Sequence, residues 1–177
     1  MTILSCGRQA PAPPAIDPRL AAQVPRDATA IVSLRPDSLV AVRGGQVLTF
    51  APEGNPGAAG APKSALLADA EAMSARYPMW AVIRGGTALP LDGNLANLNN
   101  LIADAELVTI GGRRDDRLAL EMIAACASEE RARRFEGSLR AVLLLIQAGP
   151  GARVRREGRT VHAEMAVPAE LADKLGR

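Results

Sequence analysis

A strand pattern that runs directly into a long amphipathic helix pattern, over residues 117–149, constrains this fold more than any other part of the chain. From Leu118 to Cys126 apolar residues recur at every second position, which is the period of a strand with one buried face. Ser128 then predicts the N-cap of a helix, and the two glutamates after it put negative charge where the helix dipole stabilises it. Steps of three and four residues place one apolar stripe along this helix: Ala132, Phe135, Leu139, Val142, Leu143 and Ile146. The helix is therefore expected to lie on a sheet that contains the strand.

The composition indicates a globular domain with an aliphatic core. Of the 177 residues, 48% are apolar, yet there are only one Trp, one Tyr and two Phe. The 21 basic and 19 acidic side chains leave a formal charge of +2, which is too balanced to predict a polyanionic partner. No uninterrupted apolar run approaches the length of about 18 residues that a transmembrane helix needs.

Residues 1–26 are expected to form a disordered N-terminal tether. Within it, the segment Ile3–Gly7 resembles the end of a bacterial lipoprotein signal, in which the cysteine, here Cys6, is acylated. The alanine- and proline-rich stretch that follows is typical of an extended linker, although a charged n-region and a full apolar stretch do not precede Cys6. Lipidation of Cys6 predicts a periplasmic, membrane-anchored location in the cell envelope. Without an upstream signal, the chain is expected in the cytoplasm.

Residues 27–177 are expected to form one α+β domain of two similar units, at about 27–90 and 104–177. Each unit is expected to contain a β-hairpin, a helix and a returning strand. The first hairpin turns at Gly44-Gly45, because paired glycines supply the positive φ of a two-residue turn. This outline predicts two ferredoxin-like units, with helices covering one face of an antiparallel sheet.

No group of residues predicts a catalytic, cofactor or metal site. His162 is the only histidine, so a zinc site would lack ligands, and Cys126 falls on the buried face of its strand as a core residue. The Pro52–Pro62 loop is rich in glycine but lacks the Gly-Lys-Ser/Thr ending of a phosphate-binding loop. Asp92 and the asparagines after it lack the closing glutamate of a calcium loop.

Two other classes of protein stay open beside a binding domain. A small hydrolase would need two of four groups to meet in a pocket: Asp92, Asp115, Asp116 and His162. A nucleic-acid-binding ferredoxin-like module would need an exposed aromatic on its sheet, for which Trp80 is the candidate. It would also need a surface that gathers the arginines Arg113, Arg114, Arg131, Arg133, Arg134, Arg155 and Arg156.

Four segments carry strand and turn motifs: Asp27–Pro36, Tyr77–Trp80, Leu118–Glu130 and Arg156–Val161. In these motifs the chain resembles a group of uncharacterised bacterial secreted or lipoprotein-type proteins with ferredoxin-like α+β repeats. The resemblance covers most of 27–175, and it implies an envelope location and a non-enzymatic role. No catalytic residue carries over from it.

We therefore expect a non-catalytic cell-envelope domain that offers its sheet face or the Pro52–Pro62 loop to an unidentified protein partner. No cofactor and no nucleic acid are expected. The exposed hairpin edges allow two copies to pair, so a homo-oligomer is a further expectation.

Overall fold

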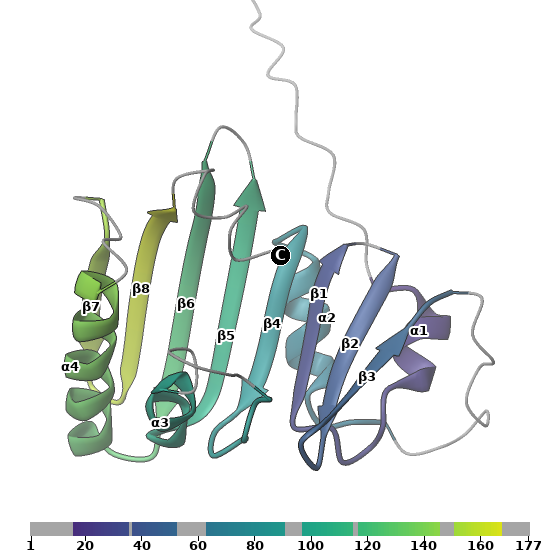
Figure 1. Cartoon of the computed structure of the whole chain (residues 1–177), viewed down its shortest axis with the longest axis horizontal. Helices are drawn as coiled ribbons and strands as arrows, with labels where there is room; N and C mark the ends of the chain where they lie inside the picture. The colour runs from purple at the N-terminus through teal and green to yellow at the C-terminus, as the bar shows by residue number, and fades with distance from the viewer. Residues whose placement is uncertain are drawn as a thin grey trace, which may run out of the picture.

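The computed structural model describes residues 16–35, 37–52, 63–90, 97–114, 117–145 and 151–167. The strands are β1 Ala30–Arg35, β2 Ser38–Arg43, β3 Gln46–Phe50, β4 Met79–Arg84, β5 Ala105–Arg114, β6 Leu118–Cys126, β7 Arg153–Glu157 and β8 Thr160–Val167. The helices are α1 Pro18–Gln23, α2 Leu67–Ser74, α3 Asn97–Ala103 and α4 Glu129–Leu145. Within these ranges one eight-stranded antiparallel sheet forms, in the order β3-β2-β1-β4-β5-β6-β8-β7 (Figure 1).

The turn predicted at Gly44-Gly45 and the cap predicted at Ser128 are confirmed. Gly44 and Gly45 have φ values of 55° and 78° and join β2 to β3 in a two-residue turn. Ser128 caps α4, because its Oγ accepts a hydrogen bond from the Arg131 N–H at 3.2 Å. Asp17 caps α1 in the same way, at 2.8 Å from the Arg19 N–H.

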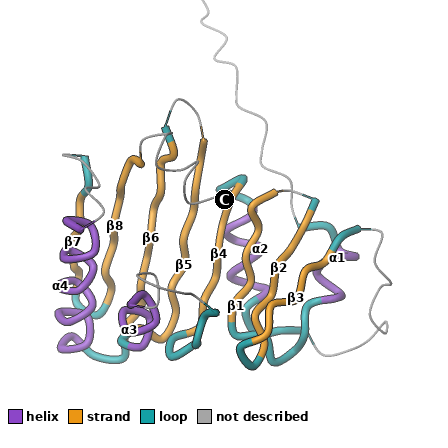
Figure 2. Tube along the Cα trace, viewed as in Figure 1, coloured by secondary structure: helices purple, strands orange, loops and turns teal. Residues whose placement is uncertain are grey.

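The helices lie on both sides of the sheet. Figure 2 shows α3 and α4 on the near side of the strands and α2 on the far side. Two separate cores follow, and neighbouring residues of one strand belong to different cores: in β1, Ala30 packs with α3 and α4, whereas Ile31 packs with α1 and α2. Both residues are fully buried. We call the two sides of the sheet the α1–α2 side and the α3–α4 side.

The prediction of two ferredoxin-like units with helices on one face is wrong. The structure instead has a single sheet with its helices divided between both faces. In the centre of the sheet, β4 buries Val82 on the α1–α2 side and Ile83 on the α3–α4 side. An unbroken apolar run such as Met79–Ile83 is typical of a strand covered on both faces, and one helix layer cannot cover both.

Each half of the sheet is covered on a different side. On the α1–α2 side, the described helices pack over β1, β2, β4 and β5, where Leu20 of α1 and Val24 at its C-cap are buried. Residues 16–26, at the end of the expected tether, therefore include a helix that contributes to the core. On the α3–α4 side, α4 packs over β5, β6, β7 and β8. As a result, β6, β8 and β7 carry no described helix on the α1–α2 side.

None of the described helices is both long enough and apolar enough to span a lipid bilayer.

Candidate functional site

The α1–α2 side of β6, β8 and β7, together with the adjoining end of β5, forms a sheet surface that we call the open face. Strand alternation and register set out its residues in rows. One row contains Gly111, Glu121, Glu164 and Arg153. The next row contains Thr109, Ile123, His162 and Arg155. Polar and small side chains therefore dominate this surface.

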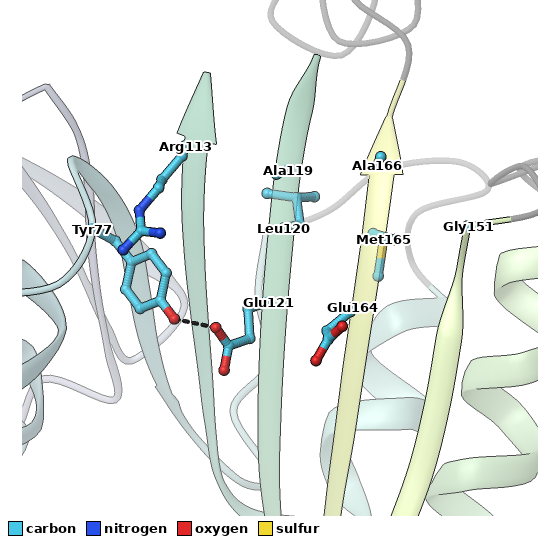
Figure 3. A pocket seen from close by; sticks show the side chains of 9 residues that line it. All are labelled: Tyr77, Arg113, Ala119, Leu120, Glu121, Gly151, Glu164, Met165 and Ala166. Carbon is cyan, nitrogen blue, oxygen red and sulfur yellow. Dashed lines mark hydrogen bonds between the residues drawn. The ribbon is translucent and has the colours of Figure 1, made fainter. Parts of the chain in front are cut away.

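Tyr77 borders the open face where the chain leaves α2 and enters β4. Its ring lies against Gly111 so closely that a Cβ atom at that position would come within 2.5 Å of ring carbons. Glycine in a strand interior commonly marks such a close approach. The packing leaves Tyr77 only 6% exposed, and its hydroxyl donates a hydrogen bond to the Glu121 carboxylate (Figure 3).

Two arginines hold Tyr77 and Glu121 in one network. The guanidinium carbons of Arg76 and Arg113 lie 5.2 and 5.1 Å from the centroid of the Tyr77 ring, within the range of a cation–π contact. Arg76 donates to the Tyr77 hydroxyl at 3.2 Å and lies 3.8 Å from the Glu121 carboxylate. Arg113 in turn donates to the Arg76 carbonyl at 3.0 Å. The network ties the segment between α2 and β4 to β5 and β6.

Burial raises the pKa of the Tyr77 hydroxyl, and the hydrogen bond to Glu121 and the negative charge of Glu121 raise it further. The hydroxyl therefore stays protonated at neutral pH and acts as a hydrogen-bond donor. A protonated phenol is neither a nucleophile nor a general base.

A pocket of about 300 Å³ opens beside this network (Figure 3). Its lining residues are Tyr77, Arg113, Ala119, Leu120, Glu121, Gly151, Glu164, Met165 and Ala166. Glu164 is exposed and lies directly opposite Glu121 on the neighbouring strand, and its carboxylate forms no hydrogen bond or ion pair with any other described residue. The pocket thus offers an arginine donor, two carboxylate acceptors and an apolar lining that includes two alanines. Within the described ranges, no three His, Cys, Asp or Glu side chains form a group that could hold a metal ion.

Most residues of the predicted hydrolase site cannot be placed. Asp92, Asp115 and Asp116 lie outside the described residues, as does Cys6. His162 is half-buried in the middle of the open face, opposite Ile123 and Arg155.

The arginines considered for nucleic-acid binding lie on different surfaces. Arg113 and Arg155 belong to the open face, whereas Arg131, Arg133 and Arg134 belong to α4 on the other side of the sheet. Arg134 is engaged by Glu130 and Asp104 at 2.8 and 3.0 Å, and Arg156 by Glu136 at 3.2 Å. Trp80 is 5% exposed in the α1–α2 core, so its ring is not presented for base stacking.

Cys126 is a core residue, as predicted. It is 2% exposed in the α3–α4 core, and burial raises the pKa of its thiol. A buried thiol with a raised pKa is chemically inert.

The sequence-based prediction missed Tyr77, Glu121 and Glu164 as a group. Strand β5 continues to Arg114. The adjacent pair Gly111-Gly112 therefore lies inside a strand, and glycine in a strand interior is a sequence signal for a side chain packed on the backbone.

Comparison with models of protein families, with curated proteins and with solved structures finds no match for this chain. The resemblance to secreted or lipoprotein-type proteins therefore stays a prediction.

Proposed function

We propose that this chain is the non-catalytic binding domain of a cell-envelope protein, anchored through Cys6, and that its open face holds a protein partner. The pocket beside Tyr77 carries the proposal, because three of its polar side chains, Tyr77, Arg113 and Glu121, are held in place before any ligand arrives. Hydrogen bonds and ring contacts hold Arg76, Tyr77, Arg113 and Glu121 in one geometry. Fixed groups lose little conformational entropy on binding, which favours affinity.

The chemistry of the site supports binding over catalysis. The Tyr77 hydroxyl, the group of this network best placed to act as a nucleophile, has a raised pKa and is occupied by Glu121. The carboxylate of Glu164 and the guanidinium of Arg113 are exposed beside the pocket, so the surface can accept hydrogen bonds and donate them. Both kinds of group are needed to pair the mixed side chains of a protein surface.

The dimensions of the open face fit a macromolecule. Strands lie about 4.8 Å apart, so β5, β6, β8 and β7 together are roughly 19 Å wide. An α-helix with its side chains has a diameter of about 10–12 Å, so a helix of a partner fits within this width. The small residues Ala119 and Ala166 allow such an element to come close to the sheet.

The first test places a photo-crosslinking amino acid on the open face in cells. Ala119 is exposed at the pocket, and Ser138 is exposed on α4 on the opposite side of the molecule, so the two positions form a matched pair. We expect one discrete adduct from position 119 and none from position 138. The same adduct should disappear when Glu121→Ala and Glu164→Ala are combined with the probe. Adducts of equal yield from both positions, or none from position 119, would overturn the proposed surface.

The second test addresses the anchor. The protein is expressed from its full upstream reading frame, and membranes are separated from soluble material for wild type and Cys6→Ser. We expect the wild type with the membranes and the variant in the soluble fraction. The same distribution for both proteins would refute the anchor and leave the open face to be judged by crosslinking alone.

A further inference from the structure

The outer edge of β3 lies at the other end of the sheet from the open face, and it presents unpaired backbone groups. The turn at Gly44-Gly45 has two residues, so the flanking pair, Arg43 and Gln46, exchanges both backbone hydrogen bonds. The Val42 carbonyl accepts from the Thr29 N–H at 2.8 Å on the β1 side, which agrees with this alternation. The N–H and C=O groups of Val47 and Thr49 therefore point away from the sheet.

No described residue bonds these groups of Val47 and Thr49. Helix α1 reaches this edge at one point just beyond β3, where the Gln23 amide donates to the Ala51 carbonyl at 3.4 Å. Val47 is 53% exposed, and Thr49 is exposed as well. None of the five residues of β3 is charged. An uncharged edge strand with open backbone groups is a template for pairing with another strand.

The opposite edge of the sheet, at β7, is protected against pairing with another strand, and the edge at β3 differs from it. Strand β7 has four charged residues among five: Arg153, Arg155, Arg156 and Glu157. By the same alternation, the Val154 carbonyl points outward, and Arg140 of α4 donates to it at 2.7 Å. Charges and a capped carbonyl are the usual means of blocking an edge. The chain blocks one edge and leaves the other without charge.

We propose that two copies of this chain associate by antiparallel pairing of β3 with β3 about a two-fold axis. With Leu48 on the axis, Val47 of each copy lies opposite Thr49 of the other, and these are the residues whose backbone groups point outward. Every open N–H of one copy then meets an open C=O of the other. The side chains of Val47 and Thr49 lie on the α3–α4 side of β3, next to Val42 and Val40 of β2. Cross-strand pairs of β-branched residues stabilise a sheet.

A second copy fits this edge because the arrangement is self-complementary. A two-fold axis brings the same surface patch of both subunits together, and β3 contains no charge that would repel its own copy. Pairing of such short strands buries little surface, so we expect a weak dimer that forms at micromolar concentrations. The dimer leaves the open face accessible, and it does not depend on the proposed function.

The test measures the mass of the full chain by sedimentation velocity in a reducing buffer, at about 5–500 μM. We expect wild type to shift from the 18.5 kDa of one chain towards twice that mass. A basic variant combines Val47→Lys with Thr49→Lys, and an acidic variant combines Val47→Glu with Thr49→Glu. Both positions are exposed, so both variants are expected to fold, which circular dichroism checks.

Each variant alone should stay monomeric, with a dissociation constant at least about tenfold higher, because like charges then lie opposite each other. An equimolar mixture of the two variants should dimerise again, since opposite charges face each other across the axis. The control Arg133→Glu changes an exposed charge on α4 and should leave the dimer unchanged. A wild type that stays monomeric at all concentrations would overturn the proposal. A basic variant that dimerises like wild type, or a mixture that stays monomeric, would overturn it as well.

Discussion

Replacing Gly111 by alanine tests the packing of Tyr77 that positions the whole site. The new Cβ would lie 2.5 Å from Cγ and Cδ2 of the Tyr77 ring and 2.6 Å from Cε2. Real Cβ atoms do not approach other atoms so closely, so the ring must move away from β5. Overpacking of this kind costs about 1–3 kcal/mol. Loss of the hydrogen bond from Tyr77 to Glu121 adds about 1 kcal/mol.

We therefore expect Gly111→Ala to lower the free energy of unfolding by about 2–4 kcal/mol. Gly137→Ala is the matched control, because a Cβ there meets no atom within 4 Å and the position is exposed on α4. The same chemical change should stabilise the protein by about 0.5–1 kcal/mol at that position, since alanine is the better helix former. The two substitutions are thus expected to have opposite signs.

The assay is equilibrium unfolding in urea, followed by far-ultraviolet circular dichroism. A double-mutant cycle with Tyr77→Ala isolates the contact, because removal of the ring leaves the new methyl group without a clash. In that background Gly111→Ala should cost less than about 0.5 kcal/mol. An equal loss with and without the Tyr77 ring would refute the close packing, and so would a Gly111→Ala variant as stable as wild type.

Three further predictions concern single contacts. Hydrogen bonds and charge from Arg140, and then from Arg156, hold the pKa of Glu136 below its ordinary value of 4.5. The stability that ionised Glu136 contributes is therefore present above pH 4.5 and is lost as the pH falls through the lowered pKa. Glu136→Gln should therefore flatten the fall in stability on acidification, and an unchanged slope in acid unfolding would contradict this. The pKa of Tyr77 is raised from 10.0, so its contribution is complete below pH 10.0 and is lost as the pH rises through the raised value. In alkaline unfolding Tyr77→Phe should lack this loss, and at neutral pH it should be about 1 kcal/mol less stable because the bond to Glu121 is gone. Ser128→Ala removes the α4 cap and should cost about 1 kcal/mol in thermal or urea unfolding, whereas Ser138→Ala on the exposed face of the same helix should cost nothing.

Local structure could be predicted where neighbouring residues determine it. The turn at Gly44-Gly45, the cap at Ser128 and the apolar stripe of α4 depend on contacts within a few residues. The turn and the cap are confirmed, and the stripe is confirmed at Ala132, Phe135, Leu139 and Leu143, whereas Val142 is only partly buried and Ile146 lies outside the described residues. The same holds for the burial of Cys126, which follows from strand alternation. These features required no knowledge of which strands are neighbours.

The distribution of helices between the two faces could not be predicted from the same patterns. Apolar alternation shows that a strand has a buried face, but it does not show which side of the sheet a distant helix will cover. The central strand β4 gave a usable signal, since Met79–Ile83 is apolar without interruption. Given that signal, cover on both faces could have been expected, though the assignment of α1 and α2 to one side and of α3 and α4 to the other could not.

The candidate site likewise depends on contacts between distant segments, which the sequence patterns do not predict. Tyr77 and Glu121 are 44 residues apart, and only the pairing of β4, β5 and β6 brings them into contact. Glu164 joins them because β8, and not β7, lies next to β6. In the sequence, the glycine pair at 111–112 and isolated polar residues in apolar strands were the only traces of this arrangement.

By itself, the sequence determined the periods, turns and caps of the individual elements, because those depend on local backbone geometry and on the spacing of apolar side chains. Only the tertiary structure decided the strand order, the separation into two cores and the open face with its pocket. Strand order depends on pairing between segments far apart in the chain, and such pairing leaves no periodic signal in either segment alone.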